Sequence, residues 1–459
     1  METYTEKLAQ FAIQLKYKDI PKEVVKKAKL LILDSLGCTV GAWQLVPGEV
    51  VLETAQELGG NGPFRVVGSN VKLPLSWTIF ANSYGGNLLD FDDVHPIAGH
   101  PGATIIPPAL ALIQNRNITG KELITTIVAA YEIGMRIANA IAPSSERSQD
   151  IIGFATWQIF TSALVAARLL KLTSIQTAHA LAIAGTRAVV PYVRKSGRHE
   201  RPYAWVKNNY GWTALGGYLS VEQASRGFRG NLTLLNGSKG FWLMAGSDNC
   251  QEEKYTEGLS ETFKILDVGI KPYPTCRHIH TALDALWQIL REHPINPDEI
   301  RNIVVFGSPA LVEDFIVPEP VDVIDAQFSL SYTMALMLLG YKSGYPWLNS
   351  DRIHDPEVIK IAKKIQARVD QPASVQAHAD WPVRVKVYLK GNETFEEQVL
   401  IPRGHPDRPL TIDEQYSKYK HLSFPVIGEI NSEKVLKKIM NLEDEKGLIW
   451  FEELTKPLE

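Results

Sequence analysis

The sequence predicts a mainly α protein in which a large helical domain is joined to a smaller α/β domain. Apolar residues recur at helical spacing throughout the first part of the chain. Strict alternation of apolar and polar residues, the pattern of a half-buried strand, occurs instead at 383–390. Charged sequence with helical spacing returns near the C-terminus. We therefore expect a discontinuous all-helical domain, 1–266 and 403–459, and an α/β domain at 267–402.

The helices of the larger domain are predicted from their apolar faces and start signals. An amphipathic helix is expected at 5–17, and the aspartate and proline at 19–21 predict the start of the next one. Two Ala-rich segments, 121–141 and 160–172, are apolar nearly all round, which is typical of helices buried within a bundle. A capping-box pattern at 173–176 opens a further buried helix.

The α/β domain is predicted from short runs of strand-forming residues. An apolar run occupies 303–306, and the alternating segment 383–390 is followed by a Gly-Asn turn and a partner strand near 394–401. Helical spacing returns between these strands and again in the C-terminal part. The segments concerned are 281–292, 329–339, 412–419 and 432–440.

Composition places the chain among ordinary globular proteins. Hydrophobic residues make up 45% of its 459 residues, and the formal net charge is −3. This charge gives no reason to expect binding to nucleic acid or to a membrane surface. We find no signal-peptide pattern and no apolar run long enough to cross a membrane. With three widely spaced cysteines, the chain is expected to be soluble, cytoplasmic and reduced.

The densest group of acid–base side chains lies at residues 88–102, here called the acidic loop. It carries three carboxylates and two imidazoles, which are Asp90, Asp92, Asp93, His95 and His100. Prolines and glycines in its second half interrupt regular helix. A stiff loop of this kind can present a proton-transfer group to a buried pocket. A solvated acidic turn would have the same composition.

The acidic loop, together with the helix start after it, resembles the signature of the MmgE/PrpD family. Residues 89–93 read Leu-Asp-Phe-Asp-Asp, a His-Pro pair comes at 100–101, and an apolar, proline-containing helix start occupies 103–112. The resemblance recurs at several motifs over nearly the whole chain. It implies an MmgE/PrpD-like fold, in which the smaller domain is a lid over a cleft, and a homodimer. The family includes 2-methylcitrate dehydratases, cis-aconitate decarboxylases and iminodisuccinate epimerases.

The resemblance implies roles for residues of the acidic loop. Asp90 and His100 match the catalytic Asp and His of the family, and an imidazole can take up or release a proton near neutral pH. Asp92 and Asp93 also match, as helix caps or as groups that position His100, and Asp93 is further expected to bind substrate. His95 falls where the family varies, and we interpret it as a surface or supporting residue.

Two positions depart from the pattern of the decarboxylases in this family. Val94 stands where those members carry a threonine, and the segment 153–157 holds no histidine where they carry a second one. The chain thereby lacks one hydroxyl and one imidazole that could donate a proton or contact substrate. These departures weaken the expectation of cis-aconitate decarboxylation more than that of proton abstraction in general.

Cations that would hold substrate carboxylates are implied at two further motifs. Lys207 lies in Trp-Val-Lys-Asn-Asn-Tyr-Gly-Trp, similar to the family segment whose lysine contacts a carboxylate, although a surface lysine would look the same. Lys271 and Arg277 belong to Lys-Pro-Tyr-Pro-Thr-Cys-Arg-His-Ile-His, which matches another family motif. Its prolines fix an extended backbone. We expect Lys271 to be a second carboxylate clamp and Arg277 to make a bidentate contact.

Two more site residues are implied in the α/β domain. His280 begins its first helix, where it would cap that helix or bind substrate. Tyr332 matches a family tyrosine whose phenol donates a hydrogen bond to substrate, although an aromatic residue packed in a helix would look the same.

The function that we predict is that of a cofactor-free lyase acting on small polycarboxylates. Proton abstraction beside a carboxylate needs a base, an acid and cations. Metal-binding and nucleotide-binding motifs are missing from the sequence, so no metal or cofactor is expected. A hydro-lyase resembling 2-methylcitrate dehydratase is the main hypothesis. The alternatives are an epimerase of an imino- or hydroxy-dicarboxylate, a cis-aconitate decarboxylase-like enzyme, and a non-catalytic helical scaffold.

Overall fold

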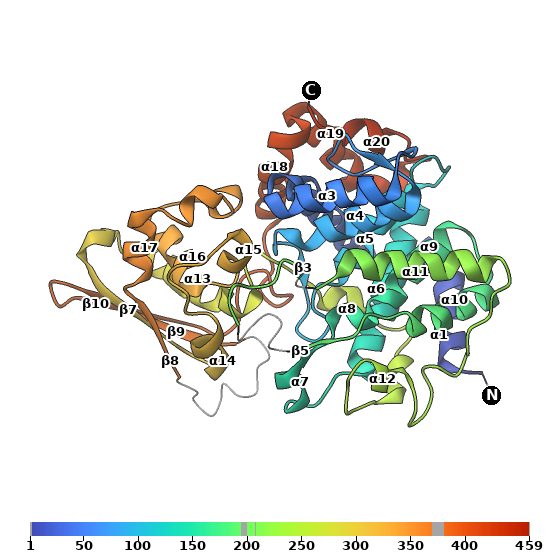
Figure 1. Ribbon diagram of the computed structural model, residues 1–459, viewed down its shortest axis with the longest axis horizontal. Coiled ribbons are helices and arrows are strands. Elements are labelled where there is room, and N and C mark those ends of the chain that lie inside the picture. Colours follow the sequence, from blue (N-terminus) through green and yellow to red (C-terminus); the bar gives the residue numbers. More distant parts are fainter. Residues whose placement is uncertain (1, 194–199, 207, 370–380, 459) are drawn as a thin grey trace.

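The computed structural model describes residues 2–193, 200–206, 208–369 and 381–458. Figure 1 shows two bodies side by side, a larger one made of helices and a smaller one that contains a sheet and helices. The predicted fold class, mainly α with a smaller α/β part, is confirmed. We retain the division at 267 and 402 as a proposal for the domain limits.

The larger body is built around long helices from the N-terminal half of the chain. They are α1 (Tyr4–Gln14), α2 (Lys22–Gly41), α3 (Val46–Gly59), α4 (Leu75–Leu88), α5 (Ile106–Leu112), α6 (Gly120–Ala140), α9 (Ile159–Leu169), α10 (Ser174–Thr186) and α11 (Tyr210–Ser225). The same body contains three short helices, α7 (Arg147–Asp150), α8 (Phe154–Trp157) and α12 (Phe241–Met244). As predicted, α6 and α9 are almost entirely buried.

Helix start signals were informative in one case and misleading in another. Thr173 forms the predicted capping box with Gln176 at the start of α10. The expectation that Asp19 caps α2 was wrong, because the residue at its N-cap is Pro21 and no side chain caps it. Asp19 instead ends a short 3-10 turn, Tyr17–Asp19.

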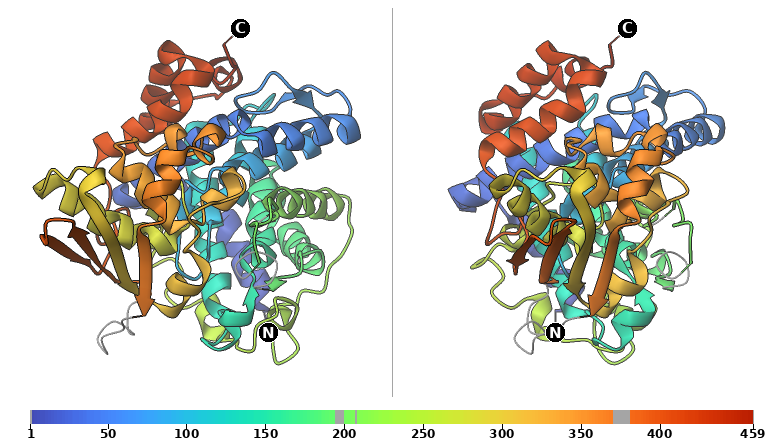
Figure 2. Two further views of the ribbon diagram at one scale, coloured as in Figure 1. Left: turned by 60° about the vertical axis from the view of Figure 1, so that its left-hand side comes forward. Right: turned by 90° about the vertical axis from the view of Figure 1, so that its left-hand side faces the viewer.

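The C-terminal part of the chain returns to the larger body as α18 (Ile412–Ile427), α19 (Glu429–Met440) and α20 (Trp450–Leu454). Figure 2 shows these red helices at one end of the molecule, beside the blue N-terminal helices. Helix α18 packs against α2. This contact places Lys418 of α18 next to the acidic loop, although the two are more than 300 positions apart in sequence.

The smaller body contains a four-stranded sheet in the order β10-β9-β7-β8. Strands β7 (Ile300–Gly307), β9 (Val383–Leu389) and β10 (Thr394–Val399) were expected, whereas β8 (Ile365–Val369) was not. Strand β8 pairs with β7 in parallel, and the other pairs are antiparallel. The helices of this body are α13 (His280–Glu292), α14 (Pro309–Asp314), α15 (Val323–Ala326), α16 (Leu330–Leu338) and α17 (Pro356–Ala362).

The two bodies share backbone pairing and buried side chains. Strand β3 (Asp93–Val94) of the acidic loop pairs with β6 (Gly269–Ile270). A buried apolar cluster runs from the sheet and α13 into the larger body, where it includes Trp43 and Phe91. Arg201 also forms an ion pair with Asp325 of the smaller body, at 2.6 Å. The interface between the two bodies is therefore built by segments far apart in sequence.

No single helix in the described part of the chain is long and apolar enough to cross a membrane. The bent pair 22–44 and 46–59, taken together, has the necessary length and composition.

Candidate active site

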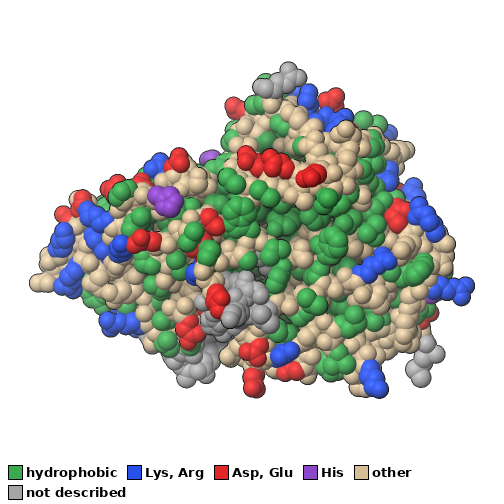
Figure 3. Space-filling view, in the orientation of Figure 1, with side chains coloured by type: hydrophobic (Ala, Val, Ile, Leu, Met, Phe, Trp, Pro, Cys, Tyr) green, Lys and Arg blue, Asp and Glu red, His purple; other side chains and the backbone are tan. Residues whose placement is uncertain are grey.

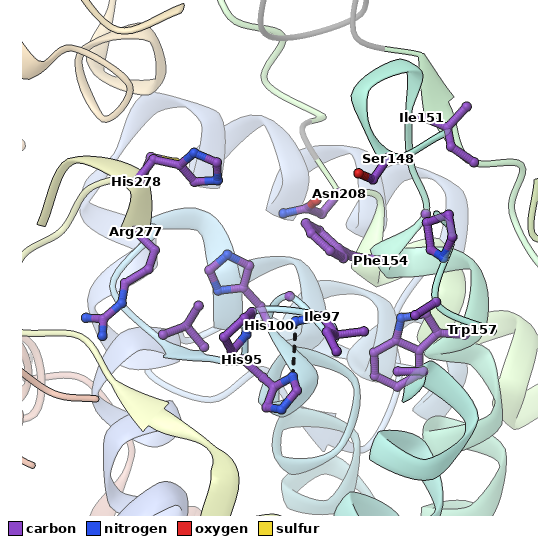
Figure 4. Close-up of a pocket in the computed structure, with 18 of the residues that line it drawn as sticks. His95, Ile97, His100, Ser148, Ile151, Phe154, Trp157, Asn208, Arg277 and His278 are labelled. Carbon is purple, nitrogen blue, oxygen red and sulfur yellow. Dashed lines mark hydrogen bonds between the residues drawn. The ribbon is translucent and has the colours of Figure 1, made fainter. Parts of the chain in front are cut away.

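A cavity of about 470 Å³ lies between the two bodies, a size typical of small-molecule sites. Figure 4 shows that the acidic loop contributes His95, Ile97 and His100, whereas Arg277 and His278 approach from the smaller body. A third part of the wall comes from residues 138–157 of the larger body.

The acidic loop leaves α4 through an uncommon backbone conformation at Asp90. Its φ of 48° lies in the left-handed region, which side chains other than glycine seldom adopt and which Asp and Asn tolerate best. The N–H of Asp90 donates to the carbonyl oxygen of Asn87 at 3.0 Å. Residues held in such conformations cluster at functional sites. The conformation turns the chain into β3 and leaves Asp90 on the cavity wall.

The acidic loop fixes one ring nitrogen of His100 by hydrogen bonding. Its Nδ1 lies 2.9 Å from the carbonyl oxygen of Asp93 and 3.3 Å from Oδ1 of Asp92. Because a carbonyl oxygen can only accept, Nδ1 carries the proton, and Nε2 of the neutral ring keeps its lone pair. Nε2 lies 3.6 Å from Oδ1 of Asp90. The structure thus brings together Asp90 and His100, and their arrangement suits a general base.

The other two carboxylates hold the acidic loop together. The N–H of Gly102 and the hydroxyl of Tyr131 donate to Asp93 at 3.0 and 2.8 Å. Asn87 donates to Oδ1 of Asp92 at 2.8 Å. Burial, and after it the charge of Asp92, raises the pKa of Asp93 well above its usual range. Asp93 is thus a buried carboxylate that fixes the loop, and its contact with substrate stays a prediction.

The side chain of Lys271 contacts Asp90 of the acidic loop. Its ammonium donates to the carbonyl oxygen of Asp90 at 2.9 Å and lies 3.1 Å from Oδ2 of the same residue. Lys271 is fully buried and is not among the described residues that line the cavity. In this structure the ammonium is paired with Asp90, and the role of Lys271 as a carboxylate clamp stays a prediction.

Arg277 lines the cavity, as a contact with substrate requires. Its Nη1 donates to the carbonyl oxygen of Arg403 at 2.9 Å. This bond ties the side chain to the segment that leads back to the larger body.

His280 and Tyr332 lie behind the cavity wall. Nε2–H of His280 donates to the carbonyl oxygen of Thr275 at 3.1 Å, and burial lowers the pKa of this histidine well below its usual range. The hydroxyl of Tyr332 has no hydrogen-bond partner in the described part of the chain and is buried within α16. Both side chains are fully buried. Neither is among the described residues that line the cavity, and their contacts with substrate stay predictions.

Lys207 lies outside the described residues. Its neighbour Asn208 lines the cavity, and Nδ2 of Asn208 donates to Oδ1 of Asn87 at 3.1 Å.

Comparison with known proteins settles the family. The sequence matches the MmgE/PrpD N-terminal domain over residues 6–253 and the MmgE/PrpD C-terminal domain over residues 273–444. The chain belongs to the MmgE/PrpD family. A cis-aconitate decarboxylase of Aspergillus terreus is 26% identical over 461 residues, which cover 95% of this chain and 92% of the relative. The human cis-aconitate decarboxylase is 22% identical over 458 residues, covering 97% and 92%.

His95 is a cavity residue that the sequence did not reveal in this MmgE/PrpD protein. Its Nδ1 accepts from the N–H groups of Ile97 and Ala98 at 3.2 and 3.1 Å, so the neutral ring carries its proton on Nε2. Burial lowers the pKa of His95 to about 4. At neutral pH it is an uncharged donor on the cavity wall. The sequence signal that could have indicated a tight turn at His95 was its proximity to Pro96 and Gly99, since such residues make tight turns.

Two further contributions come from distant segments. His278 stacks on Trp381 with ring centroids 3.7 Å apart, and both line the cavity. Lys418 of α18 is buried, donates to the carbonyl oxygens of Phe91 and Lys271, and pairs with Asp34. Helix α18 thereby fixes the acidic loop from behind. Nothing in the sequence near Lys418 indicates this role.

The acidic loop also has the side chains that a cation site would need. Ligand atoms of Asp90, Asp92 and His100 lie within 4.8 Å of one another. The ammonium of Lys271 already supplies positive charge at 3.1 Å from Asp90, which weakens the attraction of the cluster for a divalent cation. We interpret the cluster as a proton-transfer site.

Proposed function

We propose that the protein is a lyase acting on a polycarboxylate, with His100 transferring the proton at the carbon beside a carboxylate. The observation that carries the proposal is the fixed tautomer of His100, whose Nδ1–H bonds to the carbonyl oxygen of Asp93 while Nε2 lies beside Asp90. A base held in one tautomer does not have to reorganise before it accepts a proton. Dehydration is the main hypothesis for the reaction.

In this mechanism Nε2 of His100 takes the proton from carbon, and the electron pair passes into the adjacent carboxylate as an enolate. Arg277 and the Nε2–H of His95 would stabilise the developing charge, since both side chains line the cavity. The β-hydroxyl then leaves as water after receiving a proton, and a carbon–carbon double bond forms. The protonated His100 lies next to Asp90 and can return a proton to that leaving group.

Decarboxylation is the second candidate, and the names of the relatives favour it. In that reaction loss of CO₂ leaves a carbanion, and the protonated His100 would deliver a proton to carbon. The same residues can thus serve both reactions. The valine at position 94, which lines the cavity, and the buried Ala155 are the points at which this chain departs from the decarboxylase pattern.

Proton NMR of the protein in D₂O with a panel of acids separates the candidates. The panel would contain 2-methylcitrate, citrate, cis-aconitate, tartrates and iminodisuccinate. Loss of a C–H signal together with a new vinyl resonance supports dehydration, and formation of CO₂ with a shortened product supports decarboxylation. Exchange with stereochemical scrambling alone would indicate an epimerase. Absence of exchange with every compound would contradict the proposal and favour the non-catalytic scaffold.

The role of His100 is tested with His100→Asn. The asparagine amide can still donate to the carbonyl oxygen of Asp93, but it lacks the Nε2 base. We expect proton exchange to fall by roughly 10²–10⁴-fold while the circular dichroism and melting temperature stay near wild type. His179→Asn, on α10 and away from the cavity, is the matched control and should exchange normally. Equal activity of the two variants would overturn the assignment.

We also propose that the protein is a homodimer located in the cytoplasm. Figure 3 shows apolar surface over the helices of the larger body, where Val46, Val50, Trp212 and Leu219 are exposed by 57%, 46%, 54% and 42%. No disulfide joins the three cysteines, all of which lie in the described part of the chain, and this supports a reducing compartment. Light scattering should give twice the chain mass, and Trp212→Asp should give one chain mass. The control Ile430→Asp alters an exposed residue of α19 and should stay dimeric. A monomeric wild type would contradict this proposal.

A further inference from the structure

The two ends of the cavity differ in chemistry. At the end beside the smaller body lie His100, His95, Arg277 and His278, among which Arg277 offers positive charge and His95 an N–H donor. At the opposite end Figure 4 shows Ile97, Ile151, Phe154 and Trp157. The rest of that wall is also apolar or small, and comprises Ala138, Ile141, Ala142, Pro143 and Ala245.

The apolar end is a built feature of the fold. Ile141 follows α6 and Trp157 ends α8, and both are 4% exposed. Phe154 packs directly on Gly99 of the acidic loop, where a β-carbon would lie 2.5 Å from the phenyl Cγ. Gly99 also has a φ of 68°, which favours glycine. The position of the apolar end is therefore tied to the loop that carries His100.

No charged side chain lines the apolar end in the part of the chain that the structure describes. The hydroxyl and amide groups of Ser145, Ser148 and Gln149 line its rim and are exposed. A carboxylate placed among Ile141, Ile151 and Trp157 would lose its hydration without gaining a cation from the described residues, which is costly. An alkyl or aryl group placed there would be favoured, because it removes apolar surface from water.

We propose that the substrate is a polycarboxylate that bears an apolar substituent, with its carboxylates at the His95–Arg277 end and the substituent against Ile141, Ile151, Phe154 and Trp157. The inference rests on the proposed function for the placement of the reacting carbon beside His100. It extends that function, because small acids with carboxylates at every end would leave the apolar end unfilled or would bury a charge in it.

Binding of substituted succinates to the full-length protein tests this inference. Isothermal titration calorimetry would compare succinate, methylsuccinate, propylsuccinate and propane-1,2,3-tricarboxylate. Propylsuccinate and the tricarboxylate carry side arms of similar size on the succinate core, but only the arm of the tricarboxylate is charged. We expect the dissociation constant to fall by roughly fourfold for each added methylene, and propylsuccinate to bind at least about tenfold more tightly than the tricarboxylate. A tricarboxylate that binds as tightly as propylsuccinate would overturn the inference.

Variants at the apolar end should reverse or weaken this preference. Ile141→Arg supplies a cation, so the tricarboxylate should become the tighter ligand, while Ile175→Arg, at an exposed position of α10, should keep the wild-type order. Phe154→Ala is a second variant at a half-buried site, in case the arginine prevents folding. It should lose about tenfold in affinity for propylsuccinate relative to succinate. An unchanged preference in the folded variants would contradict the inference.

Failure of the inference and failure of the proposed function give different results. If small acids exchange protons in D₂O but the succinate series binds without regard to its arm, the lyase proposal stands and the apolar substituent is wrong. The opposite result is that the succinate series binds in the expected order, but neither the acids of the panel nor their propyl derivatives exchange a proton. In that case the cavity recognises acids with an apolar substituent, and the proposed chemistry is wrong.

Discussion

The acidic loop and the segment 271–280 form neighbouring parts of the wall of one cavity and use their charged side chains differently. The acidic loop places His95 and His100 on the cavity wall and keeps Asp92 and Asp93 buried behind it. The segment 271–280 directs most of its polar groups away from the cavity. Lys271 binds Asp90, and His280 binds the backbone of its own segment.

This difference indicates a division of labour between proton transfer and support. The acidic loop carries the residues that can exchange protons, and its geometry depends on a cation from the other body. From the segment 271–280, Cys276, Arg277 and His278 reach the cavity. A resemblance to a family motif identifies the segment, but only the structure separates residues that line the cavity from residues that hold the wall.

The largest effect is expected from Lys271→Met. This change leaves the buried Asp90 without its ammonium partner, and breaking such a pair costs about 3–5 kcal/mol of unfolding free energy. We also expect proton exchange to fall by about 10²–10³-fold, mainly in kcat, because the geometry around His100 is lost. Urea denaturation and rate measurements check both.

A double variant distinguishes support from direct contact with substrate. Lys271→Met combined with Asp90→Asn removes both charges, and it should recover part of the stability lost in Lys271→Met alone. If Lys271 acted instead as a substrate clamp, Lys271→Met would raise KM and leave the stability unchanged. That result would refute the division between the two parts of the wall.

His95 makes the stability of the acidic loop depend on pH. Its pKa of about 4 in the folded state lies below the 6.5 of an ordinary histidine, because burial disfavours the charged ring. The unfolded chain therefore binds this proton first, and stability is lost as pH falls from about 6.5 to 4. The loss attributable to His95 should approach about 3 kcal/mol. In His95→Asn, whose side-chain oxygen can accept the same N–H groups, urea denaturation should show a weaker dependence over this range.

A smaller effect, confined to binding, is expected from Arg277→Gln. The variant loses a charged donor on the cavity wall, which is worth about 1.5–3 kcal/mol. KM should rise by about 10- to 100-fold, while kcat changes less than in the variants of the acidic loop. Arg291→Gln is the control, because Arg291 lies over Trp287 at the end of α13 and not at the cavity. A fall in kcat without a change in KM would give Arg277 a role in proton transfer.

Local patterns in the sequence predicted most elements of the fold. Strand β9 and helix α6 were found within one residue of their ends, since alternation and helical spacing report which faces are buried. Strand β8 escaped detection because it lies at the edge of the sheet, and most of its residues are not buried. Its sequence, Ile-Gln-Ala-Arg-Val, alternates over only five residues, a shorter run than that of β9.

The candidate site was less predictable, because its geometry depends on contacts between distant segments. Sequence motifs identified Asp90, His100 and Arg277 as members of one site. They could not show that Lys271 turns to Asp90, or that Lys418, more than 300 residues away, donates to the backbone of the acidic loop. A lysine that binds substrate and one that neutralises a buried aspartate have the same local sequence.

The smallest of these effects tests how closely the acidic loop is packed. In Gly102→Ala the added β-carbon would lie 2.6 Å from Oδ1 of Asp93, so the carboxylate that fixes the loop must shift. We expect a loss of about 1–3 kcal/mol in unfolding free energy and a lower exchange rate, because the carbonyl of Asp93 also holds Nδ1 of His100. Gly391→Ala, in the turn between β9 and β10, meets no atom within 4 Å and should change neither quantity. Equal behaviour of the two variants would mean that the loop tolerates displacement, and the fixed tautomer of His100 would then lose its structural basis.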